Sequence, residues 1–264
     1  DLVRSRGLGD VYKRQVYVLE VNPRSSRTVP FLTKMTGIPM VGLATRIILG
    51  HNLADLGYRG GLWPDRPYVG VKAPVFSWGK LTRVDTSLGP EMKSTGEVMG
   101  IDSAYGTALY KAFVAAGIDP AGSGPVLITV SDRDKEEVLP IAVWLSRLGH
   151  PIYATRGTAA ALGKAGIKAR AVAKIGEGSS EIVDLIRAGK ISLVINTLTR
   201  GKIPERDGYR IRRAAAEHGI PCLTSLDTAA AMARALTEVM AGRDVQVVPL
   251  QQYQAMAGPP WRRD

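Results

Sequence analysis

The sequence contains one cysteine, Cys222, so no disulfide can form within the chain. Such sparse use of cysteine is typical of the reducing cytoplasm, where we expect this protein to work. No apolar run approaches the roughly 18 residues that span a membrane, so we expect no membrane partner. Aromatic residues make up only 6%, and the basic residues are scattered among acids. The net charge of +11 therefore indicates a solvated surface or pockets for anionic metabolites, rather than a nucleic-acid face.

The 264 residues are enough for one or two domains with a buried core. Residues 1–15 fit nothing downstream and lack the apolar core of a signal peptide, and their ending resembles translated adaptor sequence. We expect them to be a non-native leader, the alternative being a short disordered native arm. The next hundred residues predict a strand, a helix, a strand interrupted by Pro74, and a helix capped by Asp102. These elements are expected at Val16–Asn22, Ile38–Leu49 (ended by Gly50), Tyr68–Trp78 and Asp102–Ala116.

A Gly- and Pro-rich linker at residues 117–124 separates this part from a regular alternation of strands and helices. Five repeats of strand and helix over residues 125–250 predict a mostly parallel sheet covered on both faces, followed by a frayed tail at 251–264. The strands are expected at 126–130, 152–155, 169–173, 193–196 and 222–224. The helices are expected at 135–148, 158–165, 180–188, 209–218 and 226–240.

Polar residues accumulate where these strands end, at the edge where open parallel sheets bind ligands. Gly157 lets a ligand approach the backbone at the start of a helix, where free N–H groups favour an anion. The hydroxyls of Thr155 and Thr158, with Lys174, complete a predicted phosphate site. Asn196 carries both the donor and the acceptor needed to recognise a base or a ribose. The alternative for each threonine is a helix cap, and Ser225 is expected to cap the last helix.

Catalytic groups are scarce around this predicted pocket. Of the three histidines, His150 and His218 fall on or after helices, away from the pocket. Asp132, Asp134 and Asp207 could act as bases, but carboxylates just before a helix are more typical of caps. The sequence therefore predicts binding without chemistry at this edge.

The stretch around residue 20 has a different chemistry. In an extended strand, alternate residues share a face, so Glu20, Asn22 and Arg24 are expected to point the same way. Two oxygen ligands suit Mg²⁺, and an arginine suits the phosphates that Mg²⁺ bridges. This pattern predicts part of a site for nucleotide-driven phosphoryl transfer.

Two long motifs resemble signatures of the carbamoyl-phosphate synthase large subunit. Glu20 to Phe31 (EVNPRSSRTVPF) is similar to its metal-binding strand, and Leu88 to Gly100 (LGPEMKSTGEVMG) to a second signature. The resemblance covers roughly Val16 to Val248. It implies that residues 16–116 are the end of the second ATP-grasp unit, a ligase that phosphorylates carbamate to carbamoyl phosphate. Residues 125–250 then resemble the methylglyoxal-synthase-like regulatory domain.

The resemblance also implies roles for particular residues. Glu20 and Asn22 would bind Mg²⁺ or Mn²⁺ on ATP, Arg24 would face the phosphates or the carbamate, and Arg27 would assist, unless it forms a surface ion pair. In the regulatory domain, a nucleotide monophosphate such as UMP or IMP would be bound. Its site would be formed by Thr129, Lys135, Thr155, Thr158, Lys174, Asn196 and Thr197. The absence of a histidine matching methylglyoxal synthases favours regulation over a lyase activity.

The whole enzyme would feed arginine and pyrimidine biosynthesis, with the rest of the large subunit and a glutaminase small subunit as partners. We expect the chain alone to be inactive, because the lysines and loops that hold ATP are missing. Two positions depart from the family: Ala73 follows Val71-Lys72 where some members bind ornithine through an acidic residue, and the loop at 196–201 differs from some relatives. The alternative is a stand-alone regulatory module that binds nucleotide monophosphates, which an upstream reading frame without ATP-grasp sequence would favour.

Overall fold

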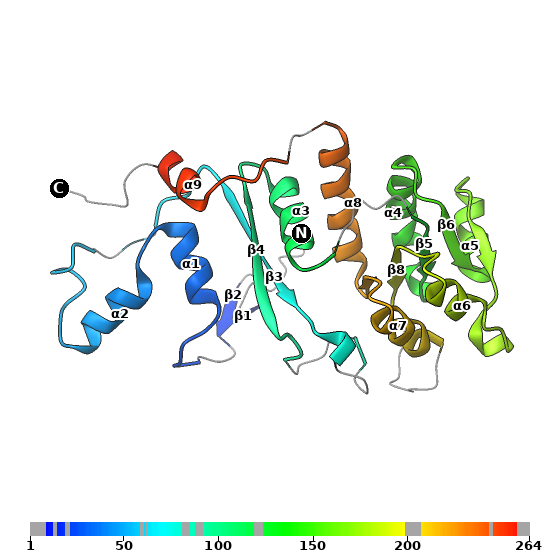
Figure 1. Cartoon of the computed structure of the whole chain (residues 1–264), viewed down its shortest axis with the longest axis horizontal. Helices are drawn as coiled ribbons and strands as arrows, with labels where there is room; N and C mark the ends of the chain where they lie inside the picture. The colour runs from blue at the N-terminus through cyan, green and yellow to red at the C-terminus, as the bar shows by residue number, and fades with distance from the viewer. Residues whose placement is uncertain are drawn as a thin grey trace. The chain divides into compact units, whose positions relative to one another are not determined.

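The computed structural model describes residues 9–12, 15–18, 22–58, 61, 63–80, 85–87, 92–118, 124–198, 207–242 and 245–257. The chain divides into two compact units, Asp1–Leu62 with Pro260–Asp264 and Trp63–Pro259. Figure 1 labels their elements, and each unit is considered by itself. Among the described residues, no helix is long and apolar enough to cross a membrane.

The first unit contains a hairpin and two helices. Strands β1 (Gly9–Tyr12) and β2 (Gln15–Val18) pair antiparallel, and α1 (Thr28–Thr36) contacts α2 (Met40–Ile48). Helix α2 confirms the helix predicted in this region, and Gly50 follows it with a φ of 97° that favours glycine. The predicted strand corresponds to β2, which ends at Val18, and residues 19–21 lie outside the described part.

A two-stranded antiparallel sheet opens the second unit. Strand β3 (Val69–Val75) pairs with β4 (Gly96–Asp102), and a 3₁₀ turn η1 (Trp78–Lys80) follows β3. Pro74 lies opposite Glu97 in an uninterrupted register, so it occupies an edge strand and makes no bulge.

Helix α3 (Tyr105–Ala115) packs on this sheet. The prediction that Asp102 caps this helix was wrong, because the N-cap is Ala104. The Asp102 carboxylate instead forms an ion pair with Lys111, within α3, with an Oδ2–Nζ distance of 2.6 Å.

The rest of the second unit is the predicted α/β fold, with a sheet in the order β7-β6-β5-β8-β9 in which every pair is parallel. The strands are β5 (Val126–Thr129), β6 (Ile152–Thr155), β7 (Arg170–Val172), β8 (Leu193–Asn196) and β9 (Cys222–Leu223). The helices are α4 (Lys135–Arg147), α5 (Arg156–Lys164), α6 (Glu181–Arg187), α7 (Asp207–Glu217), α8 (Leu226–Met240) and α9 (Leu250–Met256), with 3₁₀ turns η2 (Asp132–Asp134) and η3 (Ile175–Glu177).

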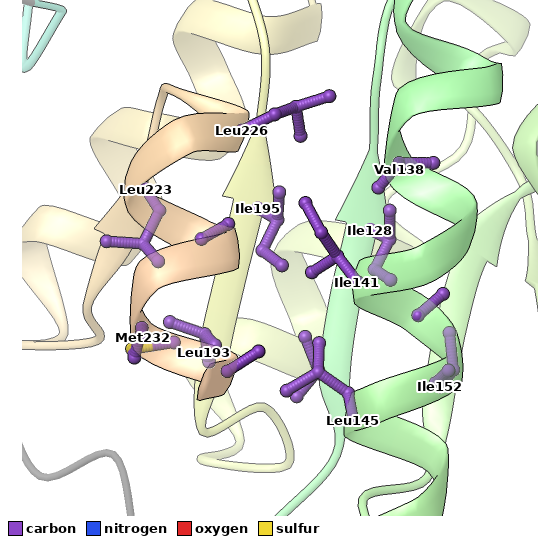
Figure 2. Packing of buried hydrophobic residues seen from close by; sticks show 14 of the residues in the cluster. Ile128, Val138, Ile141, Leu145, Ile152, Leu193, Ile195, Leu223, Leu226 and Met232 are labelled. Carbon is purple, nitrogen blue, oxygen red and sulfur yellow. The ribbon is translucent and has the colours of Figure 1, made fainter. Parts of the chain in front are cut away.

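The central strands β5 and β8 are buried on both faces of the sheet, which suits their apolar residues. Ile128 of β5 packs with α4, α5 and α8, whereas its neighbour Leu127 packs with α6 and α7. Figure 2 shows the hydrophobic cluster around Ile128, in which Ile195 of β8 packs with Ile141 of α4 and Met232 of α8. The two hydrophobic layers fix the strands, and so fix the loops at their carboxyl ends.

Candidate functional site

The candidate site lies at the carboxyl edge of the five-stranded sheet. Thr129 at the end of β5 is directly opposite Asn196 at the end of β8, and Thr155 ends β6 on the other side of β5. The parallel register therefore brings the predicted residues of three strands to one edge, as the sequence predicts.

The start of α5 supplies the backbone of the site. The helix begins at Arg156 rather than at the predicted Thr158, so Thr158 lies in its first turn and Thr155 is its N-cap. Neither threonine makes a side-chain cap bond there; the Thr155 hydroxyl donates to the Thr158 hydroxyl at 3.3 Å. Both side chains are buried, so their hydroxyls are fixed against the helix start.

Two lysines bring positive charge to the same place. A Cβ on Gly157 would lie 3.2 Å from Lys135 Nζ, so the missing side chain leaves room for the ammonium beside the helix start. Lys135 pairs with Asp132 at 2.6 Å. The hydrogen bond from Lys135, and then the charges of Lys135 and Lys174, lower the pKa of Asp132. The charge of Lys174 makes the smallest of these contributions.

Asn196 and Thr197 are held by contacts within the fold. The Asn196 amide nitrogen donates to the Thr129 carbonyl at 3.3 Å, and its second hydrogen remains for another acceptor. The Thr197 hydroxyl accepts the Ser131 N–H at 2.9 Å. Thr197 thus orders the loop after β5, next to the lysine that begins α4.

The histidines and the cysteine of the second unit offer no nucleophile or base to this edge. The His150 ring contacts the Gly124 carbonyl at the amino end of the sheet, and the His218 ring contacts Ala214 at the end of α7. Both lie away from the carboxyl edge of the sheet, as predicted. Burial raises the pKa of the Cys222 thiol to about 12, so this cysteine stays protonated at neutral pH.

The other loop carboxylates have structural partners. Asp207 accepts the Gly176 N–H at 2.9 Å, and Asp134 accepts the Ser131 hydroxyl at 2.6 Å. Ser225 is the N-cap residue of α8, although its side chain makes no cap bond.

The predicted metal and phosphate residues of the first unit are only partly described. Glu20 lies outside the described residues, while Asn22, Arg24 and Arg27 are exposed. The expectation that one extended run carries Asn22 and Arg24 was wrong, because the Arg24 N–H donates back to the Asn22 carbonyl at 2.8 Å and turns the chain. Among the described residues, no cluster of three His, Cys, Asp or Glu side chains can hold a metal ion. The roles in binding metal or phosphate that the sequence predicts for Glu20, Asn22, Arg24 and Arg27 stay predictions.

Two family models match the chain. Residues 8–56 match the model "Carbamoyl-phosphate synthase L chain, ATP binding domain", and residues 137–224 match "MGS-like domain". The chain joins part of a carbamoyl-phosphate synthase ATP-binding domain to an MGS-like domain. This order is the one that the sequence motifs predict for the end of the large subunit. The first match begins at residue 8, before the predicted boundary at Val16.

The MGS-like match contains most of the candidate site. Thr155, Thr158, Lys174, Asn196 and Thr197 lie within it, whereas Thr129 and Lys135 precede it.

Solved structures that are similar to the chain include a methylglyoxal synthase and ForH. Methylglyoxal synthase from Elizabethkingia anophelis NUHP1 is 17% identical, with a TM-score of 0.35 over 42% of this chain and 76% of that one. ForH is 21% identical, with a TM-score of 0.34 over 51% of this chain and 90% of that one.

Gly157→Ala is expected to separate stability from anion binding. The new methyl meets only the flexible end of Lys135, and alanine favours a helix over glycine by roughly 0.5–1 kcal/mol, so the urea midpoint should hold or rise. If this edge binds anions, affinity for inorganic phosphate, measured by calorimetry, should fall about tenfold because Lys135 is displaced from the helix start. Gly163→Ala, in the same helix with open space at its Cβ position, is the control and should leave affinity unchanged. An unaltered affinity in Gly157→Ala would remove the start of α5 from the site.

Proposed function

We propose that this chain is the C-terminal part of an ATP-dependent carbamoyl-phosphate synthase large subunit, in which the MGS-like domain binds a regulatory nucleotide monophosphate. The observation that carries the proposal is the order of the two family matches along one chain. The ATP-binding part would phosphorylate carbamate to carbamoyl phosphate for arginine and pyrimidine synthesis in the cytoplasm. The rest of the large subunit and a glutaminase subunit would be its partners.

In the ATP-binding part, Glu20 and Asn22 would hold Mg²⁺ or Mn²⁺ against ATP. A divalent ion there supplies charge neutralisation and alignment for the transferred phosphoryl group. Arg24 and Arg27 are exposed cations close in sequence to Asn22, which supports a role in attracting the anionic carbamate or the phosphates.

In the MGS-like domain, regulation is favoured over catalysis by the groups present. The helix start of α5, Lys135 and Lys174 offer donors and positive charge to a phosphate monoester. Asp132 pairs with Lys135, and its lowered pKa keeps it charged at neutral pH. Neither histidine of the second unit, His150 or His218, reaches this edge to serve as an acid or base.

Calorimetry with UMP, IMP and inorganic phosphate tests the regulatory site. We expect the wild type to bind at least one nucleotide monophosphate, and Lys174→Ala to weaken this binding about tenfold through loss of one charge-assisted contact. Lys168→Ala removes an exposed lysine before β7, at the opposite edge of the sheet, and should bind like the wild type. Equal binding by Lys174→Ala and the wild type would remove Lys174 from the site, and no binding by the wild type would refute the regulatory role.

A further inference from the structure

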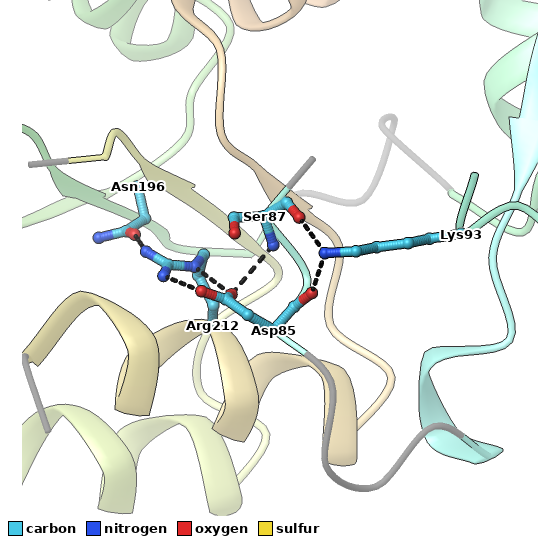
Figure 3. Close-up of polar contacts among 5 residues, drawn as sticks. All are labelled: Asp85, Ser87, Lys93, Asn196 and Arg212. Carbon is cyan, nitrogen blue, oxygen red and sulfur yellow. Dashed lines mark hydrogen bonds and ion pairs between the residues drawn. The ribbon is translucent and has the colours of Figure 1, made fainter. Parts of the chain in front are cut away.

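A buried arginine connects the candidate site to a loop from a distant part of the sequence. Arg212 on α7 is 5% exposed, and its guanidinium donates to both oxygens of Asp85, from Nε at 3.0 Å and from Nη2 at 2.8 Å. The third nitrogen, Nη1, donates to Asn196 Oδ1 at 2.8 Å. Figure 3 shows Arg212 lying between Asn196 and Asp85. One rigid, planar group thus joins the end of β8 to the connection between β3 and β4.

The Asp85 end of this link is itself an ordered turn. The Ser87 N–H donates to Asp85 Oδ1 at 3.0 Å, so the carboxylate that binds Arg212 also stabilises the turn at Asp85–Ser87. Lys93 Nζ then donates to the Asp85 and Ser87 carbonyls at 3.1 and 2.7 Å. Lys93 precedes β4 by a few residues, so the turn is tied to the two-stranded sheet of the predicted ATP-grasp part.

The Asn196 end belongs to the candidate site. Because Arg212 occupies Asn196 Oδ1, the amide nitrogen is directed at the Thr129 carbonyl across the strand pair. Gly208, in the first turn of α7, leaves the space for this contact: a Cβ there would lie 3.0 Å from Arg212 Nη1 and 3.4 Å from Asn196 Oδ1. Arg212 therefore decides which way the Asn196 amide faces.

We propose that Arg212 is a positioning residue that couples nucleotide binding at the carboxyl edge to the order of the turn at Asp85–Ser87; this rests on the proposed regulatory function. A ligand carbonyl that accepts the second Asn196 N–H would fix the same amide orientation that Arg212 holds. Ligand and loop then stabilise each other through one fork of hydrogen bonds. Coupling between two sites is reciprocal, so a change that uncouples the turn from Asn196 must also lower the affinity for the ligand, by the factor through which the ligand orders the turn.

The first readout needs no ligand. The side-chain NH₂ signals of Asn196, assigned by ¹⁵N NMR in the full chain, should shift in Arg212→Lys and in Asp85→Asn. Lysine keeps the charge but lacks the fork, and Asp85→Asn changes a residue that reaches Asn196 only through Arg212. Arg210→Lys, on the exposed side of the same helix, is the control and should leave these signals in place. Unshifted Asn196 signals in Asp85→Asn would overturn the link.

The second readout uses UMP as the probe. In the wild type, saturating UMP should slow hydrogen exchange of the Ser87 amide, and Arg212→Lys should lose this protection and bind UMP at least fivefold more weakly. If the ion pair between Arg212 and Asp85 is purely structural, Arg212→Lys will be less stable but its UMP affinity and the protection of the Ser87 amide by UMP will be unchanged. That result would overturn the proposal. If the wild type binds neither UMP, IMP nor phosphate, the regulatory function fails, and the Asn196 signals alone support or overturn the positioning role.

Discussion

Gly100→Ala is expected to destabilise the second unit by at least about 3 kcal/mol, the upper end of the cost of overpacking a core. Gly100 is a buried residue of β4, where α3 approaches the strand directly. A Cβ would lie 2.0 Å from the Ala108 carbonyl oxygen and 2.5 Å from the Ala112 nitrogen. Both atoms are helix backbone, so the clash can be relieved only by moving the helix off the sheet.

Urea unfolding measures this loss, with Gly96→Ala as the matched control. Gly96 begins the same strand, and its Cβ would meet Val75 at an ordinary 3.6 Å. We expect the control to unfold near the wild-type midpoint and Gly100→Ala to unfold at much lower urea. Equal midpoints for the two variants would mean that α3 does not pack on β4 in this way.

The parallel sheet and its edge could be predicted from the sequence because its signals are local. Short apolar runs bounded by turn residues predict β6 and β8 with the observed bounds, Ile152–Thr155 and Leu193–Asn196. Once these strands are parallel, the polar residues that follow them must lie at one edge. Thr155, Lys135 and Asn196 reach the candidate site for this reason alone.

Contacts between distant residues could not be predicted in the same way. Asp85 and Arg212 are 127 positions apart, and an arginine in a helix is ordinarily exposed. The one local sign that Arg212 is buried was its place on the apolar face of α7, between Ile211 and the buried Ala214 and Ala215. For Asp102 the local signal was present but a tertiary contact overrode it. Its position before a helix is typical of a cap, but its carboxylate pairs with Lys111 instead.

Asp85→Asn is expected to lower stability by about 2 kcal/mol at neutral pH, because asparagine offers one oxygen to a guanidinium that needs two. The Arg212 side chain is 6% exposed, so water does not replace the lost acceptor. The Asp85 side chain is 31% exposed, which keeps the expected loss below that of a fully buried ion pair.

This loss should depend on pH in a defined direction. Partial burial alone raises the pKa of Asp85, but hydrogen bonds from Arg212 and Ser87 and the charge of Arg212 outweigh it and lower the pKa. A carboxyl group whose pKa is lower in the folded state stabilises the protein above its unfolded pKa of about 3.9, and this stabilisation is lost as pH falls through the folded value. The difference between wild type and Asp85→Asn should therefore be constant near pH 7 and shrink below about pH 4.

Urea midpoints measured from pH 7 down to acid for both proteins give this difference directly. Other carboxylates with lowered pKa, such as Asp102 and Asp134, are present in both proteins, so their contributions cancel. Asp65→Asn, at an exposed position of the same unit, should follow the wild type at every pH. A stability difference that persists unchanged well below pH 4 would show that the charge of Asp85 is not what Arg212 requires, and the link between loop and sheet edge would then rest on shape rather than on an ion pair.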